Sequence, residues 1–281
     1  MPPEKSAPEA ERRSSVIESF FGLHGIPFGR SVPVAELLRT DGWDELHARM
    51  LHTARARGFG VFTGDTGTGK TTSLRRFAGE LDPNRYRVLY VCDSFLTPRN
   101  FYWEVLHQLG CTPRFYRGDA KRQFQKALRE VNEERKNPVV VVDEAHLLSR
   151  EMLEEIRFLL NTGMDSESSL ALLLVGQSEL KDALKLQVNQ AIAGRVDIRF
   201  HLGAMDKGQT ASYVKRHMDS VKAPRDIFTS TALGMIHEYA GGIPRKVNKV
   251  ASSCLMTAAV RKETLVDDHL VQEVLESEFE I

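Results

Sequence analysis

The sequence predicts an α/β fold in which a parallel five-stranded sheet flanked by helices is followed by a small all-helical domain. Three features predict this class. A glycine-rich loop joins a short apolar strand to a helix within residues 59–81, four consecutive valines stand at 139–142, and such apolar runs stop after residue 203. Strands that are apolar on both faces are typical of parallel sheets with helices on either side.

The glycine-rich loop is a full match to the phosphate-binding motif Gly-x-x-x-x-Gly-Lys-Thr. Its glycines let the backbone curl so that N–H groups point at phosphate oxygens, and the helix that follows adds the positive end of its dipole. Lys70 supplies a cation for the β- and γ-phosphates, and the Thr71 hydroxyl suits Mg²⁺. The predicted nucleotide-binding residues are Gly64, Asp65, Thr66, Gly67, Thr68, Gly69, Lys70, Thr71 and Thr72.

Two carboxylates, Asp143 and Glu144, follow the four valines directly. Open α/β sheets bind ligands where their strands end, so these carboxylates are expected near the phosphate loop. We expect Asp143 to hold Mg²⁺, directly or through water, and Glu144 to orient and activate the attacking water. The alternative is a pair of surface carboxylates that begin a helix.

Hydrophobic periodicity and turn residues predict the other elements in order. Strands are expected at 59–63, 87–91, 139–142, 170–175 and 196–202. Helices are expected at 43–57, from the phosphate loop to about 81, and at 99–109, 120–136, 149–160 and 179–186. Four more helices are expected at 207–221, 229–239, 244–260 and 267–276, with Thr229 and Asp267 as N-caps.

The predicted domain organisation has three parts. Residues 1–15 form a disordered tail, 16–203 form the phosphate-loop domain, and 204–281 form the helical domain. The phosphate-loop domain would begin with an anchor segment that contains Phe20, Phe21, Leu23, Ile26 and Phe28. This segment is expected to pack on the main domain, or alternatively to cover an adenine ring in part.

Composition restricts the possible partners. Lys and Arg balance Asp and Glu at 38 each, so nucleic acid could bind only at a local basic patch. No apolar run approaches the ~20 residues of a membrane-spanning helix, and the N-terminus lacks the apolar core of a signal peptide. The three cysteines are widely spaced and are expected to be buried free thiols. These features predict a cytoplasmic protein without membrane contact.

Taken in order, the motifs resemble those of AAA+ ATPases, and specifically the ExeA/TnsC-like group of bacterial proteins. The resemblance spans about residues 17–276 and rests on FFGL…PF, GDTGTGKTT, VVVVDEAHLLSREMLEEIRFLLN, LLLVGQSEL, AGRVDIRFHL and GGIPRKVN. It implies a P-loop AAA+ ATPase domain with a helical lid, and hydrolysis of ATP with Mg²⁺. Gly64–Thr72 corresponds to Walker A, and Val139–Glu144 corresponds to Walker B.

The resemblance also implies roles for four residues outside these two motifs. Gln177 falls at sensor 1, where many AAA+ proteins have asparagine, and Arg245 matches sensor 2. Arg195 falls where the arginine finger acts on the nucleotide of a neighbouring subunit, with Arg199 as the nearby competitor. From the residues alone, Gln177 either contacts the γ-phosphate or the attacking water, or is a turn residue with no catalytic role. Without the resemblance, solvated arginines at 195 and 245 would be the simpler interpretation.

The group that the chain resembles has two kinds of member. Some are target-selection ATPases of DNA transposition, similar to TnsC, MuB and IstB, which assemble on DNA with ATP and recruit a transposase. Others are secretion-associated ATPases, which usually continue into a membrane segment. The chain ends at Ile281 directly after the helical domain, which favours transposition. We therefore expect a homo-oligomer, as a ring or filament, with duplex DNA and a transposase as partners. A nucleotide-dependent protein-binding switch with negligible turnover is a further alternative.

A local patch for DNA is available after the second predicted strand. The loop at 110–118 and its flanking helices interleave cations with aromatic side chains, and in transposition AAA+ rings this region faces the DNA channel. Cations there would neutralise phosphates without reading sequence. The candidate DNA-binding residues are Arg99, Arg114, Tyr116, Arg117 and Lys121. The alternative is a solvated charged loop.

Overall fold

The computed structural model describes residues 16–29, 40–160 and 168–279, so the predicted disordered tail lies outside the described residues. The chain divides into two compact units. One unit comprises Asp41–Gly203, and the other combines Ala204–Ile281 with the N-terminal residues up to Thr40. The division after Gly203 falls where the apolar strand-like runs of the sequence stop.

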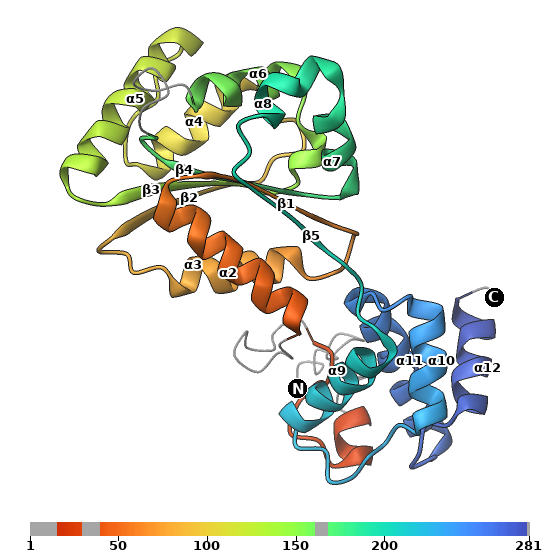
Figure 1. Ribbon diagram of the computed structural model, residues 1–281. Helices are drawn as coiled ribbons and strands as arrows, with labels where there is room; N and C mark the ends of the chain where they lie inside the picture. Colours follow the sequence, from red (N-terminus) through yellow and green to blue (C-terminus); the bar gives the residue numbers. More distant parts are fainter. Residues whose placement is uncertain (1–15, 30–39, 161–167, 280–281) are drawn as a thin grey trace, which may run out of the picture. The chain divides into compact units, whose positions relative to one another are not determined.

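The first unit is built on five parallel strands in the order β2-β3-β4-β1-β5 (Figure 1). The strands are β1 (Phe59–Gly64), β2 (Tyr86–Val91), β3 (Asn137–Val142), β4 (Ala171–Gly176) and β5 (Ile198–Leu202). The predicted fold class is therefore confirmed. The strand order reverses at β1, which has β4 on one side and β5 on the other. Open α/β sheets bind their ligands at the position of such a reversal.

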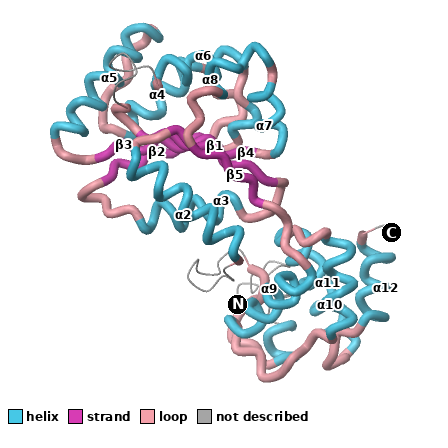
Figure 2. The backbone as a smooth tube through the Cα atoms, in the orientation of Figure 1, coloured by secondary structure: helices cyan, strands magenta, loops and turns pink. Residues whose placement is uncertain are grey.

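Helices cover both faces of the sheet (Figure 2). They are α2 (Asp41–Ala56), α3 (Lys70–Glu80), α4 (Pro98–Gln108), α5 (Arg117–Glu133), α6 (Arg150–Leu159), α7 (Ser178–Lys185) and α8 (Gln190–Ala193). In β3, Val139 and Val141 share a core with α2 and α3, whereas Val140 and Val142 share the opposite core with α4, α5 and α6. All four valines are buried, and each stabilises the layers by about 1.5–3 kcal/mol.

Some element boundaries differ from those expected. Helix α5 begins at Arg117 rather than at residue 120, so this arginine is helical and not part of a loop. The short turns η2 (Ala145–Leu147), η4 (Gln187–Asn189) and α8 were not predicted. Segments of three or four residues are too short to show hydrophobic periodicity, which explains why the sequence did not reveal them.

The second unit contains four packed helices that were predicted from the sequence. They are α9 (Lys207–Ser220), α10 (Ser230–Ala240), α11 (Pro244–Arg261) and α12 (Asp268–Glu278). The side chain of Thr229 accepts a hydrogen bond from the amide of Ala232, and that of Asp267 accepts one from Leu270, so both predicted N-caps are confirmed. Gly242, in the GGIPRK motif, has a φ of 70°, and an added Cβ there would overlap the Met205 carbonyl oxygen.

The N-terminal aromatic segment does not belong to the sheet unit, which corrects the expected domain boundary. Residues 16–29 group with the helical unit. The Phe28 ring lies 5.0 Å from the His217 ring on α9, and the His24 amide donates a hydrogen bond to the Val221 carbonyl. Phe21 is also buried. Phe21, Leu23 and Phe28 are therefore buried within the helical unit rather than anchored on the sheet, whereas Ile26 is 51% exposed.

The three cysteines are free, as expected, but only one of them is buried. Burial raises the pKa of the Cys254 thiol to about 12. Cys111 is partly exposed and Cys92 is exposed, so the expectation that all three are buried is wrong. Cys92 directly follows the last residue of β2, where the chain leaves the sheet.

Candidate nucleotide-binding site

The phosphate loop leaves β1 and enters α3 through two glycines in the left-handed backbone region. Gly67 has a φ of 88° and Gly69 a φ of 101°, a conformation that strains any residue with a Cβ. A Cβ on Gly69 would also lie 3.1 Å from the Trp43 ring. The Trp43 indole N–H donates to the Thr68 carbonyl at 3.0 Å, so a side chain of α2 bonds directly to the main chain of the phosphate loop.

Lys70 lies inside the curl of this loop. Its ammonium donates to the carbonyl oxygens of Gly64 at 2.7 Å and Asp65 at 2.9 Å, and the residue is only 8% exposed. Thr68 is buried as well, and its hydroxyl donates to the Asp65 carbonyl at 2.9 Å. The main chain therefore fixes the position of the cation within the loop.

Thr71 and Asp143 meet at the start of α3, where the sequence predicts Mg²⁺. The Thr71 hydroxyl donates to Asp143 Oδ2 at 3.2 Å, and Asp143 is buried. A hydroxyl and a carboxylate oxygen are ligands that suit Mg²⁺, with phosphate oxygens completing its shell, so this pair fits the ion. The Tyr90 hydroxyl also donates to Asp143 Oδ2, at 2.9 Å. Burial and the charge of Asp143 raise the pKa of Tyr90, so this phenol keeps its proton.

Glu144 occupies a strained backbone position beside Asp143. Its φ is 53°, a left-handed conformation that is uncommon for residues other than glycine and that recurs at helix ends and at functional sites. Its amide donates to Asp143 Oδ1 at 2.9 Å. The Nδ1 atom of His146 lies 3.5 Å from the Glu144 carboxylate.

Gln177 joins the phosphate loop to His146. The Thr66 hydroxyl donates to Gln177 Oε1 at 2.6 Å, and Gln177 Nε2 lies 2.9 Å from His146 Nε2. The neighbouring Ser178 hydroxyl donates to the Asp65 carboxylate at 2.8 Å. The turn after β4 is thus bonded on one side to the phosphate loop and on the other to η2, which follows Glu144.

Three residues at this site were not singled out in the sequence: Trp43, Tyr90 and His146. His146 carried a usable signal, because it is two residues after Glu144 in the run Asp-Glu-Ala-His. No sequence pattern marked Trp43 or Tyr90 as functional, because an aromatic residue in a predicted helix or strand is usually assigned to the hydrophobic core. Only the fold brings Trp43 to the phosphate loop and Tyr90 to Asp143.

The three candidate arginines lie on different elements. Arg195, between α8 and β5, donates to the Arg157 carbonyl at 3.0 Å, and Arg199 on the edge strand β5 donates to the Ala193 carbonyl. Arg245 is exposed in the first turn of α11, in the helical unit. Their assigned roles remain predictions.

Two of the candidate DNA-binding cations are engaged within the fold. Arg117 pairs with Glu155 and, at 2.6 Å, with Glu151, while Lys121 donates to Glu155 at 2.7 Å. The Glu155 side chain is 2% exposed and also accepts a bond from the Tyr102 hydroxyl. Burial acts to raise the pKa of Glu155, but the bonds from Lys121, Tyr102 and Arg117 outweigh it and lower the pKa to about 2.

The remaining members of the patch are exposed. The Arg99 guanidinium lies 4.4 Å from the centre of the Phe115 ring, and Arg114 is exposed beside it. Phe115 and Tyr116 are 69% and 71% exposed, which is unusual for aromatic side chains. Of the predicted patch, Arg99, Arg114 and Tyr116 therefore present exposed side chains, and the exposed Phe115 ring lies beside Arg99. The roles of all five predicted residues in DNA binding remain predictions.

No group of three or more His, Cys, Asp or Glu side chains suited to a metal occurs among the described residues. A Mg²⁺ site of Thr71, Asp143 and phosphate oxygens would not need one. Within the same residues, none of the helices has the length and apolar character needed to cross a membrane.

The sheet order, the phosphate loop after β1 and the carboxylates after β3 define the AAA+ P-loop ATPase fold. Residues 52–184 match a family model described as an AAA domain. Drosophila ORC bound to DNA has a TM-score of 0.70 at 18% identity, covering 98% of this chain and 69% of that one. Cdc6p from Pyrobaculum aerophilum has a TM-score of 0.67 at 16% identity, covering 92% and 70%. At these identities the likeness shows the fold alone.

One curated relative adds a similarity in sequence. General secretion pathway protein A of Aeromonas hydrophila is 30% identical over 248 residues. The match covers 86% of this chain but 45% of the relative, so the chain spans less than half the length of that protein.

Proposed function

We propose that the chain is a Mg²⁺-dependent ATPase of the AAA+ class that oligomerises when it binds ATP. One observation carries the proposal: the residues after β1, β3 and β4 converge on the phosphate loop. Thr71 bonds to Asp143, Gln177 links Thr66 of the loop to His146 beside Glu144, and Lys70 bonds to carbonyls of the same loop. A solvated glycine-rich turn would require no such convergence of a buried lysine, two carboxylates and an amide.

Each side chain then has a defined task. Lys70 and the loop amides hold the β- and γ-phosphates, and Thr71 with Asp143 hold Mg²⁺, which would neutralise phosphate charge. Glu144 orients and activates the attacking water, and Gln177 contacts the γ-phosphate or that water. Arg245 from the helical unit and Arg195 from a neighbouring subunit would stabilise the charge of the transition state.

For the work that hydrolysis drives, we propose target selection in DNA transposition, in the manner of the TnsC-like group. Exposed Arg99, Arg114, Phe115 and Tyr116 support contact with a duplex backbone, and two of the fold neighbours are described as bound to DNA. Each subunit offers only a few cations, so strong binding would need several subunits aligned along the duplex by ATP. A transposase would be the protein partner.

The similarity to General secretion pathway protein A favours a second candidate, an ATPase associated with secretion. A binding switch with negligible turnover is a third candidate, against which the position of Glu144 beside Asp143 and His146 argues. Both alternatives predict no affinity for duplex DNA that depends on ATP.

DNA binding separates these candidates. Fluorescence anisotropy of a labelled random-sequence duplex is measured at several salt concentrations, with and without a slowly hydrolysed ATP analogue. We expect binding that needs the analogue and weakens with salt. Arg99→Glu/Arg114→Glu should abolish it, whereas Lys126→Glu/Arg129→Glu on the exposed face of α5 should not.

If the wild type fails to bind with the analogue at low salt, the transposition role is wrong and the secretion role is favoured. If both double variants bind as the wild type does, DNA binding stands but the patch is elsewhere. Charge reversal at Arg117 and Lys121 is unsuitable for this test, because it would leave Glu155 buried without its partners.

A further inference from the structure

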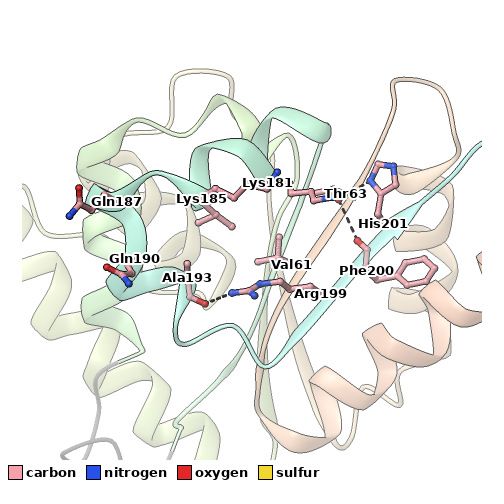
Figure 3. A pocket seen from close by; sticks show the side chains of 11 residues that line it. Val61, Thr63, Lys181, Lys185, Gln187, Gln190, Ala193, Arg199, Phe200 and His201 are labelled. Carbon is pink, nitrogen blue, oxygen red and sulfur yellow. Dashed lines mark hydrogen bonds between the residues drawn. The ribbon is translucent and has the colours of Figure 1, made fainter.

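A cavity of about 760 Å³ lies on the sheet face that carries α7 and α8 (Figure 3), and its lining shares no residue with the nucleotide cluster. Val61 and Thr63 of β1 line it from the sheet, and Leu184 of α7 lines it from the helices. All three are buried. The volume falls in the range of small-molecule sites, which bury an apolar ligand body against such a surface.

The lining of this cavity includes three cationic side chains and a histidine, beside the neutral Thr63, Gln187 and Gln190. Lys181 and Lys185 approach from α7, and Arg199 and His201 approach from β5. None of the described residues that line it is Asp or Glu. Cations gathered in a concave site without carboxylates concentrate positive potential there.

The groups of the protein that bond to Arg199 and Lys185 neutralise little of their positive charge, so this charge can act on a ligand. Arg199 donates one of its five N–H groups to the Ala193 carbonyl. This carbonyl is neutral, so the bond does not cancel the charge of the guanidinium. Lys185 pairs with Asp182 at 2.9 Å, but both side chains are more than 60% exposed, and such surface pairs are weak.

The side chains of β5 alternate between the two faces of the sheet, which explains how Arg199 and His201 reach this cavity. Ile198, Phe200 and Leu202 pack toward the core beneath α2 and α3, so Arg199 and His201 point to the opposite face of the strand. The His201 Nδ1 lies 3.1 Å from the Thr63 hydroxyl. Among the described strands β5 lies at the edge of the sheet, so no further described strand closes the cavity on that side.

We propose that this cavity binds a small molecule with an apolar body and an anionic group of the phosphate-ester class. The buried floor would take the apolar body, and Lys181, Lys185 and Arg199 would take the anion. This site goes beyond the proposed ATPase, whose nucleotide lies at the phosphate loop, and it would be occupied whether or not ATP is hydrolysed.

The test is lysine footprinting of the full chain with an amine-acetylating reagent, read by mass spectrometry. The probe is 1-naphthyl phosphate, compared with inorganic phosphate and with 1-naphthol. We expect the naphthyl ester to protect Lys181 and Lys185 but not the exposed Lys126, which is the control within the same sample. Because each lysine is read separately, binding at the phosphate loop does not obscure the result.

Arg199→Ala keeps both reporter lysines and removes one cation. The ester concentration that gives half protection should rise on the order of tenfold, as for loss of a charge-assisted bond, whereas Arg129→Ala should leave it unchanged. Equal protection of Lys126, or none at Lys181 and Lys185, would overturn the site. Equal protection by inorganic phosphate would overturn the apolar part of the proposed ligand.

Discussion

At the scale of single residues, Lys70 and Glu144 allow nucleotide binding to be separated from hydrolysis. Lys70→Ala removes the buried cation of the loop and should abolish ATP binding. Glu144→Gln keeps the size of the side chain and should bind ATP normally while hydrolysis falls by ~100-fold or more. A fluorescent nucleotide titration and a phosphate-release assay measure the two steps. Hydrolysis by Glu144→Gln at the wild-type rate would show that Glu144 is not the base.

His146 is expected to be a positioning residue that keeps the Glu144 carboxylate in line. It lies 3.5 Å from that carboxylate and 2.9 Å from Gln177, which itself accepts a bond from Thr66 of the loop. His146→Ala should lower kcat about 10- to 100-fold, as expected when a catalytic group is slightly misplaced, and should leave KM nearly unchanged.

His146→Gln is the matched variant, since its amide can still bond to Gln177 and Glu144. Partial recovery of kcat is expected. If His146→Ala raises KM and leaves kcat intact, the histidine supports the loop and does not position Glu144.

At the scale of elements, Glu155 ties α4, α5 and α6 together through Tyr102, Arg117 and Lys121. Removing the two cations and removing the carboxylate should have unequal effects. Arg117→Ala/Lys121→Ala leaves a buried charge unpaired and should cost about 3–5 kcal/mol in the free energy of unfolding. Glu155→Gln frees two partly exposed cations to reach water and should cost less, about 1.5–3 kcal/mol. Urea unfolding measures both, and equal losses would contradict this account.

The same carboxylate predicts a dependence of stability on pH. Its pKa in the folded protein, about 2, is below the ordinary value of 4.5. Ionised Glu155 therefore stabilises the fold at pH values above about 4.5, and this contribution is lost as the pH falls toward 2. The difference in unfolding free energy between the wild type and Glu155→Gln should shrink over that interval. A constant difference would show that folding does not change the pKa of Glu155.

These elements also show what the sequence could and could not predict. Periodicity placed every strand and the longer helices, because each buries a continuous apolar face, as Val139 and Val140 do on opposite sides of β3. The phosphate loop and the Asp143-Glu144 pair were predictable because their chemistry requires a local spacing. The pairing of Arg117 with Glu155 was not, since 38 residues separate them and an arginine beside aromatic residues looks the same whether it is paired or free.

At the scale of the whole molecule, Arg195 tests whether the active site is shared between subunits. Arg195→Ala should bind ATP and hydrolyse it on the order of 10³-fold more slowly. Mixed with Lys70→Ala, it should regain activity, because one variant supplies an intact phosphate loop and the other an intact arginine. Crosslinking establishes that mixed oligomers form. No recovery at any ratio would show that Arg195 does not act on a neighbour's nucleotide.

The contact between Trp43 and the phosphate loop gives the protein an intrinsic optical signal. Of its two tryptophans, Trp43 bonds to the loop carbonyl of Thr68, whereas Trp103 is half exposed on α4 and stacks on His107. In a Trp103→Phe protein, the remaining emission would come from a single indole whose N–H is bonded to the loop. Ordering of the loop around phosphates would then change the emission wavelength or intensity. Occupancy could be followed by stopped-flow mixing on the millisecond scale without any label.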